Sequence, residues 1–244
     1  MTIAVIPSRY GSSRLEGKPL VDIAGKPMIQ RVYEQAQKSA AITKTIVATD
    51  DKRIVAAVEA FGGHAVMTSD DCRSGTDRVA ETADMLNLGP DEIVVNIQGD
   101  QPVFNPLTID ELISPFADDN DFIMSTLVFK IKDEREITDP KDVKVTFDNN
   151  GFALYFSRAQ IPYPRDKETK ADFFKHLGFY AYKKSFLDKL VTLETGTCEH
   201  IEKLEQLRVL EFGFQIKVVI TPYDSPEIDL PEDIKRIEAK LLQS

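Results

Sequence analysis

Residues 3–18 read IAVIPSRYGSSRLEGK, and this stretch decides which fold the rest of the chain must complete. Its apolar start, Ile3 to Ile6, predicts a buried strand that ends at Pro7. A loop of small and cationic residues then continues to Lys18. Small residues let backbone N–H groups approach an anion, and Arg and Lys supply positive charge. A strand that leads into such a loop predicts a nucleoside triphosphate site at the carboxyl edge of a sheet, with an ordinary polar surface loop as the alternative.

This loop differs from the two common phosphate-binding fingerprints. It has neither the G-x-x-x-x-G-K-[ST] of P-loops nor the G-x-G-x-x-G of dinucleotide-binding folds, so a dehydrogenase is a remote alternative. The local charge favours an acidic ligand. Residues 1–31 carry five basic and two acidic side chains, although the whole chain has a formal net charge of −10.

The overall composition narrows the class of protein. A chain of 244 residues is long enough for one large α/β domain or two small ones. The acidic balance argues against nucleic acid as the main partner. Cys72 and Cys198 are too few and too far apart for a disulfide framework or a zinc site, so we expect buried or idle thiols in a reducing compartment. The start resembles no signal peptide, and no apolar run approaches the ~18 residues of a membrane span, so we expect a cytosolic protein.

Strands and helices alternate in the N-terminal third of the chain. Apolar spacing predicts helices over residues 27–39 and 52–61, and apolar runs predict strands over 45–49 and 64–67. Such a rhythm is typical of a parallel sheet covered by helices on both faces, which makes the expected fold class α/β. Since the chain shows no linker or internal repeat, we expect a single domain over residues 1–244.

Two polar segments follow at positions that suit a ligand. Ser74 to Arg78 opens a predicted helix, where these residues can cap the helix or offer free N–H groups to an anion. The predicted strand Glu92 to Ile97 leads into Gln98-Gly99-Asp100. Near a triphosphate, Asp100 is expected to bind Mg²⁺, which takes one or two carboxylates plus phosphate oxygens; otherwise it is a turn residue.

The alternation breaks in the second half of the chain. Residues 144–156 predict a β-hairpin around Asn149-Asn150-Gly151, as part of an antiparallel insert over about residues 122–182. Arg158 and Arg165 follow in a loop that contains prolines. Arginine pairs well with carboxylates, so these two side chains suit an acidic second substrate, with solvated loop arginines as the alternative.

Two further elements carry candidate side chains. A strand over residues 176–182 would place His176 and Tyr180 on one face of the sheet. Residues 199–211 predict one amphipathic helix with Ile201 among its inward residues, and a solvated polar flank.

Asp229 stands just before the last predicted helix, which begins at Pro231 and ends at Leu242. A carboxylate at this place can cap the helix, with proline in its first turn. It can equally serve as a second carboxylate for a metal ion. The sequence leaves both alternatives open.

Several separated motifs form a recognisable set. They are Pro7 to Leu15, Gly17 to Leu20, Ser74 to Arg78, Gln98 to Asp100, Tyr155 to Arg158, His176 to Gly178, Leu204 to Arg208 and Pro231 to Asp233. In residues, order and spacing this set closely resembles the CMP-Kdo synthetases. These enzymes are the 3-deoxy-manno-octulosonate (Kdo) cytidylyltransferases of bacterial lipopolysaccharide synthesis. The resemblance covers nearly the whole chain.

The resemblance implies a Rossmann-like nucleotidyltransferase fold, a homodimer, and use of CTP with Mg²⁺. The implied reaction converts CTP and Kdo into CMP-Kdo and pyrophosphate, and part of the family uses the 8-amino analogue of Kdo instead. The implied site residues are Arg9, Ser12, Ser13, Arg14 and Lys18 for the triphosphate; Ser74, Arg78 and Gln98 for the cytidine; Asp100 and Asp229 for magnesium; and Arg158, Arg165, His176, Tyr180, Glu205 and Gln206 for the sugar acid.

The implied chemistry needs no protein nucleophile. The anomeric hydroxyl of the sugar attacks the α-phosphorus in line with the departing pyrophosphate, and such reactions depend on positioning and electrostatics. Asp100 and Asp229 would act through the metal, while Lys18 and Arg14 would offset charge on the pyrophosphate. The absence of a Ser-His-Asp or Cys-His signature agrees with this expectation.

The chain departs from the common family pattern at two places. Gln101 follows the Gly-Asp pair, where Glu is common, and residues 227–230 read Glu-Ile-Asp-Leu where Gly-Val-Asp-Thr is frequent. One hypothesis is that Asp224 or Glu227 attracts the ammonium group of 8-amino-Kdo. Two alternatives remain: a cytidylyltransferase for another acceptor, such as a sialic-acid-like sugar or a polyol phosphate, and a nucleotide-binding protein without turnover.

Overall fold

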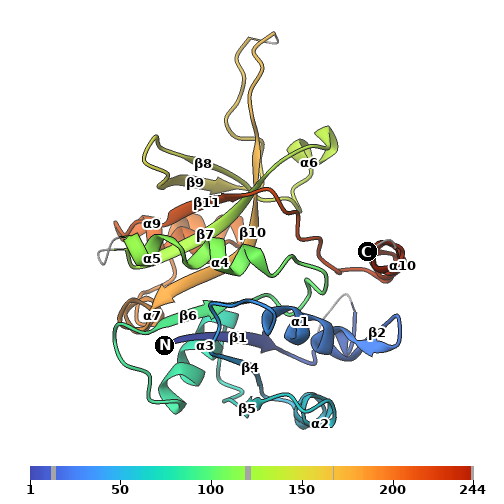
Figure 1. The fold of residues 1–244 in the computed structure, drawn as a ribbon. Helices are drawn as coiled ribbons and strands as arrows, with labels where there is room; N and C mark the ends of the chain where they lie inside the picture. Colours follow the sequence, from blue (N-terminus) through green and yellow to red (C-terminus); the bar gives the residue numbers. More distant parts are fainter. Residues whose placement is uncertain (12–14, 119–121, 167, 243–244) are drawn as a thin grey trace.

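The first apolar run forms strand β1 (Thr2–Ser8) inside the main sheet. The computed structural model in Figure 1 describes residues 1–11, 15–118, 122–166 and 168–242. Within these residues, nine strands make up the main sheet. The others are β4 (Lys44–Thr49), β5 (Ala65–Met67), β6 (Ile93–Asn96), β7 (Met124–Lys130), β8 (Lys144–Phe147), β9 (Ala153–Ser157), β10 (Phe174–Lys183) and β11 (Lys217–Thr221). Strands β2 (Asp22–Ile23) and β3 (Lys26–Pro27) pair separately.

Several helices begin where the sequence offers a cap. The Asp51 carboxylate accepts a hydrogen bond from the backbone N–H of Arg53 at the start of α2, and the Ser74 hydroxyl accepts one from the N–H of Asp77 at the start of α3. The helices of the described residues are α1 (Met28–Ala36), α2 (Lys52–Ala60), α3 (Gly75–Met85), α4 (Leu107–Ile113), α5 (Pro115–Asp118), α6 (Glu134–Thr138), α7 (Lys184–Val191), α8 (Thr197–Glu202), α9 (Gln206–Glu211) and α10 (Pro231–Leu241), with a 3₁₀ turn η1 (Lys18–Leu20).

The main sheet has the strand order β11-β7-β10-β6-β1-β4-β5. β1 pairs in parallel with β4 and β6, and β11 pairs in parallel with β7. β10 runs antiparallel to both of its neighbours, and the β8–β9 hairpin attaches to it. The predicted α/β class, with a mostly parallel sheet and a small antiparallel addition, is confirmed.

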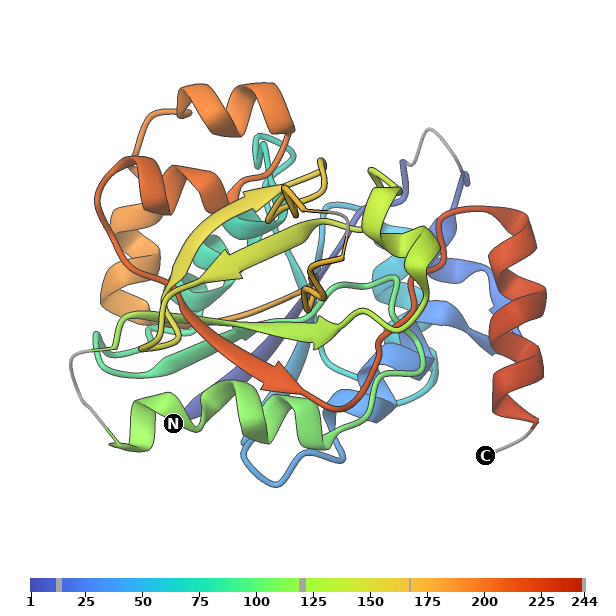
Figure 2. The same cartoon turned by 90° about the horizontal axis from the view of Figure 1, so that it is seen from above.

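Alternate residues of β1 point to the two faces of the sheet. Ala4 and Ile6 pack with α1, α2 and α4, whereas Ile3 and Val5 pack with α3, α7 and α9. Figure 2 shows green α4 and α5 on one side of the sheet and orange α8 and α9 on the other. No helix in the described part of the chain is long and apolar enough to cross a membrane.

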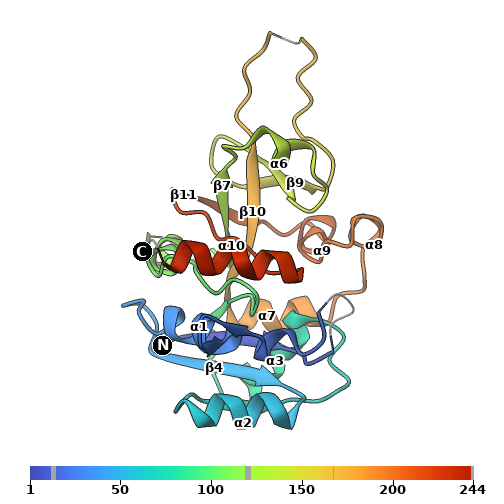
Figure 3. The ribbon, with the colours of Figure 1, turned by 90° about the vertical axis from the view of Figure 1, so that its right-hand side faces the viewer.

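Two features lie outside these layers. Helix α10 packs beside the sheet through Ile237, which meets Ile23, Met28 and Ile228 in a small apolar cluster. This helix stands in front of the other layers in Figure 3. The segment between β9 and β10, which carries Arg165, extends away from the sheet at the top of Figures 1 and 3.

The prediction of one helix over residues 199–211 is wrong. The structure has two helices here, α8 and α9, because Lys203 adopts a φ of 55° in the left-handed region and ends α8. Ile201 is 73% exposed and does not face inward. Its apolar spacing fits a continuous helix, but the turn at Lys203 changes the direction of the chain.

Candidate active site

The candidate site lies where β1 and β6 end side by side. Gly99 follows β6 and passes so close to β1 that a Cβ atom there would lie 3.1 Å from Ser8 Oγ and 3.3 Å from the Pro7 carbonyl oxygen. A side chain at this position would be crowded against β1, and glycine avoids that contact. The turn after β6 therefore brings Asp100 to the carboxyl edge of the sheet, as the sequence predicts.

Lys18 joins two carboxylates that are distant in sequence. Its Nζ atom lies 2.7 Å from Asp100 Oδ2 and 3.0 Å from Asp229 Oδ1. Burial alone lowers the pKa of Lys18, but the charges and hydrogen bonds of Asp100 and Asp229 outweigh that effect and raise it. Lys18 is therefore a fully charged ammonium group at neutral pH, held between two acids.

Asp229 does not cap the helix that follows it. Leu230 is the N-cap residue of α10, and the Asp233 carboxylate accepts hydrogen bonds from the N–H groups of Asp229 and Leu230 at 3.0 and 2.9 Å. The backbone of the preceding residue, Ile228, is fixed by a 3.0 Å hydrogen bond from its N–H to the Asp100 carbonyl. The helix-cap alternative for Asp229 is thus wrong, and its side chain points to Lys18.

The Asp100–Asp229 pair has the donor set that magnesium prefers. Two carboxylates converge on one position, which the Lys18 ammonium neutralises here. Among the described residues, no group of three or more His, Cys, Asp or Glu side chains forms a metal site. Mg²⁺ is commonly bound by one or two carboxylates, with phosphate oxygens and water as the other ligands. The pair therefore fits an ion that arrives with a nucleotide.

Three of the residues predicted to bind the nucleotide make hydrogen bonds within the protein. Arg9 is exposed and donates to the Cys72 carbonyl. Ser74 caps α3, and Gln98 Nε2 donates to the Gly178 carbonyl at 3.0 Å. The predicted residues Ser12, Ser13 and Arg14 lie outside the described residues.

Arg78 is fully buried, and its side chain connects α3 to Thr68 and Asp50. Its guanidinium group donates to Thr68 Oγ1, and it forms an ion pair with Asp50 at 2.5 Å. A buried arginine needs such partners, because an unpaired charge in the interior is costly. The structure thus shows a structural role for Arg78, and its predicted contact with cytidine stays a prediction.

His176 and Tyr180 meet as predicted, on one side of β10. Their ring centroids are 5.2 Å apart, and His176 Nε2 lies 2.9 Å from Thr126 Oγ1. Burial lowers the pKa of His176 to about 3, so this imidazole is neutral at physiological pH. Tyr180 is 8% exposed, which leaves little of it accessible in this structure.

Glu205 and Gln206 lie at the start of α9. Glu205 Oε2 accepts a hydrogen bond from Thr76 Oγ1 at 2.7 Å, and burial raises the pKa of this carboxyl. Glu205 and Ser74 line one cavity of about 340 Å³. Gln206 is buried. A predicted sugar residue and a predicted cytidine residue therefore share one pocket.

The two predicted loop arginines have surroundings different from those of Lys18, Asp100 and Asp229. Arg158 donates to the backbone carbonyl groups of Glu202 at 2.8 Å and Pro140 at 2.9 Å. Arg165 is exposed on the segment that extends away from the sheet. The structure does not bring either side chain to the carboxylate pair.

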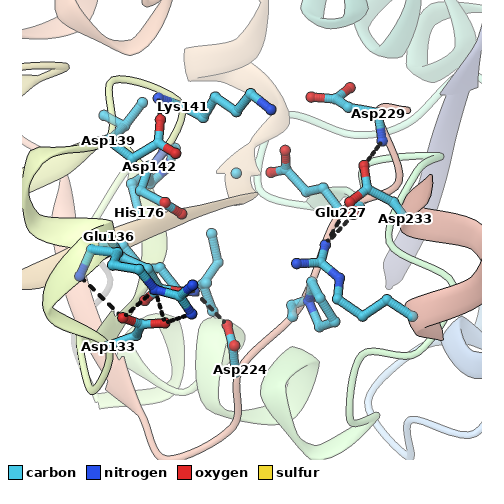
Figure 4. A pocket seen from close by; sticks show the side chains of 18 of the residues that line it. Asp133, Glu136, Asp139, Lys141, Asp142, His176, Asp224, Glu227, Asp229 and Asp233 are labelled. Carbon is cyan, nitrogen blue, oxygen red and sulfur yellow. Dashed lines mark hydrogen bonds and ion pairs between the residues drawn. The ribbon is translucent and has the colours of Figure 1, made fainter. Parts of the chain in front are cut away.

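A larger cavity of about 530 Å³ opens beside Asp229. Figure 4 shows the side chains that follow β7 facing residues 227–233 across it. Lys175 binds Glu136 and Asp224 at the wall, with distances of 2.8 and 3.0 Å. The charged side chains of the lining are Asp133, Arg135, Glu136, Asp139, Lys141, Asp142, Lys175, Asp224, Glu227, Asp229, Asp233, Arg236 and Lys240. They come from three separate stretches of the chain, residues 133–142, Lys175 and residues 224–240, so no single sequence motif contains them.

The two departures from the family pattern lie in direct contact. Gln101 Nε2 donates to Glu227 Oε1 at 3.2 Å, and Glu227 lines the larger cavity. Loss of solvent around this carboxyl, together with the charges of Asp100 and Asp229, raises the pKa of Glu227 to about 7. The residues at positions 101 and 227 are therefore joined by a hydrogen bond, so a change at one position alters the surroundings of the other.

This fold and this set of residues define a nucleotidyltransferase. Residues 3–218 match the family described as cytidylyltransferase, and the chain belongs to that family. Its similarity to particular members extends along nearly its whole length. It is 60% identical over 238 residues to the 3-deoxy-manno-octulosonate cytidylyltransferase of Desulfosudis oleivorans, which covers 98% of this chain and 96% of that protein.

Two other comparisons bear on the acceptor. The chain is 52% identical over 238 residues to the 8-amino-3,8-dideoxy-manno-octulosonate cytidylyltransferase of Shewanella frigidimarina, with 97% of each chain covered. A solved structure of CMP:2-keto-3-deoxy-manno-octonic acid synthetase in complex with CTP is similar with a TM-score of 0.93 and 43% identity, covering 99% of this chain and 98% of that one. The resemblance drawn from the motifs is confirmed.

Proposed function

We propose that this chain transfers the CMP group of CTP to an acidic eight-carbon sugar, Kdo or 8-amino-Kdo, and releases pyrophosphate. The relatives named for these two sugars support the proposal, since both groups match nearly the full chain. The observation that carries it is the convergence of Asp100, Asp229 and Lys18 at the carboxyl edge of the sheet.

Each of these side chains has a role in the proposed reaction. Asp100 and Asp229 would hold Mg²⁺, which would supply polarisation of the reacting phosphate and would favour the ionised form of the sugar hydroxyl. Lys18 exchanges its carboxylate partners for phosphate oxygens of CTP and offsets charge that develops on the leaving pyrophosphate. Arg14 and Arg9 add positive charge to the same loop.

The nucleoside and the sugar would lie next to each other beside these three side chains, since Ser74 and Glu205 line one cavity. Ser74 and Gln98 flank the place for cytidine, and Gln98 is already oriented by the Gly178 carbonyl. His176, Tyr180, Glu205 and Gln206 flank the place for the sugar. Since His176 is neutral, it would contact sugar hydroxyl groups by hydrogen bonding and not by charge.

Arg158 and Arg165 suit the sugar carboxylate only in a different arrangement of their loop or in a dimer. We include the homodimer in the proposal, together with a single nucleotidyltransferase domain over residues 1–244 whose residues 122–182 carry the sugar-binding and dimerisation insert. We place the reaction in the cytoplasm, where CTP is made.

The test is release of pyrophosphate from CTP and Mg²⁺, with Kdo and 8-amino-Kdo compared side by side for kcat/KM. Release that depends on either sugar supports the proposal, and the ratio identifies the acceptor. Release with only a sialic-acid-like sugar or a polyol phosphate would assign another acceptor. CTP binding with no release for any acceptor would make the chain a nucleotide-binding protein without turnover.

A further inference from the structure

The segment from Ser225 to Asp229 has no regular secondary structure, yet it supplies one carboxylate of the candidate site. It runs between the end of β11 and the start of α10. A chain in this state holds its shape only through side-chain and backbone contacts to its neighbours. The contacts around Gln101 supply that restraint.

Gln101 has no exposed surface, and its amide group makes three hydrogen bonds. Nε2 donates to the Leu177 carbonyl at 2.7 Å and to Glu227 Oε1 at 3.2 Å. Oε1 accepts from the Ser225 hydroxyl at 3.0 Å. These bonds fix the orientation of the amide, because a backbone carbonyl can only accept and must face the NH₂ group.

Through these bonds one side chain joins three parts of the molecule. They are the turn after β6 that carries Asp100, strand β10 at Leu177, and the segment that leads to Asp229. The hydrogen bond from the Ile228 N–H to the Asp100 carbonyl adds a backbone link between the same turn and segment. Asp100 is thus the chain neighbour of Gln101, and the residues just before Asp229 are hydrogen-bonded to Gln101 or to the Asp100 backbone.

We propose that Gln101 is a positioning residue, which holds Asp229 opposite Asp100 and turns the Glu227 carboxylate toward the cavity. This inference rests on the proposed function only in giving Asp100 and Asp229 a role in the reaction. An amide suits the position because two acceptors, Leu177 O and Glu227 Oε1, need N–H donors. A carboxylate at position 101 would instead face both acceptors and repel Glu227.

Three variants of the full chain test this role. Gln101→Met keeps the length of the side chain and removes all three hydrogen bonds. Gln101→Glu keeps the shape and removes both donors. The double variant Gln101→Glu/Glu227→Gln exchanges amide and carboxylate across the same contact, so that residue 227 becomes the donor. Gln215→Glu, at an exposed position before β11, is the matched control.

For Gln101→Met and Gln101→Glu we expect kcat to fall about tenfold or more, with KM for CTP within about twofold, as for other residues that orient metal ligands. The double variant should recover much of the loss, which a merely structural role would not produce. Titration of Mn²⁺ into protein with CTP but no sugar should show weaker binding by Gln101→Met. The control should match the wild type in every measurement.

Equal Mn²⁺ affinity and equal kcat in the wild type and Gln101→Met would overturn the inference. So would a double variant no better than Gln101→Glu. If the single variants do not fold, Ser225→Ala removes only one bond to the amide and should lower kcat in the same direction; an unchanged kcat would again overturn it. Absence of pyrophosphate release from the wild type contradicts the proposed function instead, because the Mn²⁺ titration needs no turnover.

Discussion

The Nζ atom of Lys18 lies 2.7 Å from Oδ2 of Asp100, and the same ammonium group contacts Asp229. The Lys18 side chain is only 13% exposed, so this position is shielded from bulk water. A cation that holds two acids together in this way occupies the place where we expect a divalent metal. In the proposed reaction the ammonium group and the metal would therefore compete for the same two carboxylates until phosphate groups offer Lys18 another partner.

Replacement of Lys18 by methionine tests this competition. The two carboxylates would lose the Lys18 ammonium group, and we expect the free energy of unfolding to fall by about 1–3 kcal/mol. Mn²⁺ alone should bind Lys18→Met more tightly than the wild type and should restore part of the lost stability. Isothermal titration and urea unfolding with and without Mn²⁺ measure both effects. Lys26→Met, which removes a surface ion pair with Glu34, is the control, and equal Mn²⁺ affinity in Lys18→Met and the wild type would refute the competition.

Asp100→Asn tests whether Asp100 is needed for turnover without being needed for folding. The amide keeps the shape of the side chain, and the backbone carbonyl of residue 100 still accepts from Ile228. We expect most of the turnover to be lost, by about a hundredfold or more, because the metal loses a charged ligand. The circular dichroism spectrum and the midpoint of thermal unfolding should stay close to those of the wild type. Near-normal pyrophosphate release would remove Asp100 from the mechanism.

Glu227 and Asp224 provide a test of the sugar preference. Both carboxylates line the larger cavity, where they would attract the ammonium group of 8-amino-Kdo but not the hydroxyl group of Kdo. In Asp224→Ala/Glu227→Ala we expect kcat/KM for 8-amino-Kdo to fall about tenfold more than for Kdo, which corresponds to about 1.4 kcal/mol. Glu194→Ala, at an exposed position, is the control. An unchanged ratio of the two kcat/KM values would exclude this role for the pair.

The local parts of the fold could be predicted from sequence because their signals are local. β1 follows from one apolar run, and the start of α3 follows from the cap residues between Ser74 and Arg78. The helix over residues 199–211 could not be predicted correctly. Apolar spacing does not report the backbone angle of Lys203, and no glycine marks that turn.

The sequence indicated which residues could belong to the candidate site, but it did not indicate which of them meet in space. Asp100 follows a strand, so its place at the sheet edge could be expected, but its meeting with Asp229 depends on how the chain returns after β11. The contact of Gln101 with Glu227 spans 126 residues and has no local pattern. The motifs placed Arg158 beside the sugar, whereas its guanidinium group binds two backbone carbonyls that no motif includes.

The low pKa of His176 predicts a pH dependence of stability. In the folded protein this imidazole has a pKa of about 3, whereas an exposed histidine in the unfolded chain titrates near 6.5. The unfolded state therefore binds the proton more readily, and stability falls as the pH drops from about 6.5 toward 3. The slope from this one group is up to about 1.4 kcal/mol per pH unit. Urea unfolding of the wild type and of His176→Gln at several pH values between 7 and 4 measures this contribution of His176. The carboxylates titrate in both proteins, so their contribution cancels in the difference.

The difference in unfolding free energy between the two proteins should shrink as the pH falls, because the glutamine variant lacks the titrating group. His200→Gln, in which an exposed histidine is replaced, should keep the full slope of the wild type. A constant difference between the wild type and His176→Gln over this range would show that His176 is protonated as easily in the folded protein as in the unfolded chain. The neutral, hydrogen-bonding role given to His176 beside the sugar would then have to be replaced by one for a charged imidazolium.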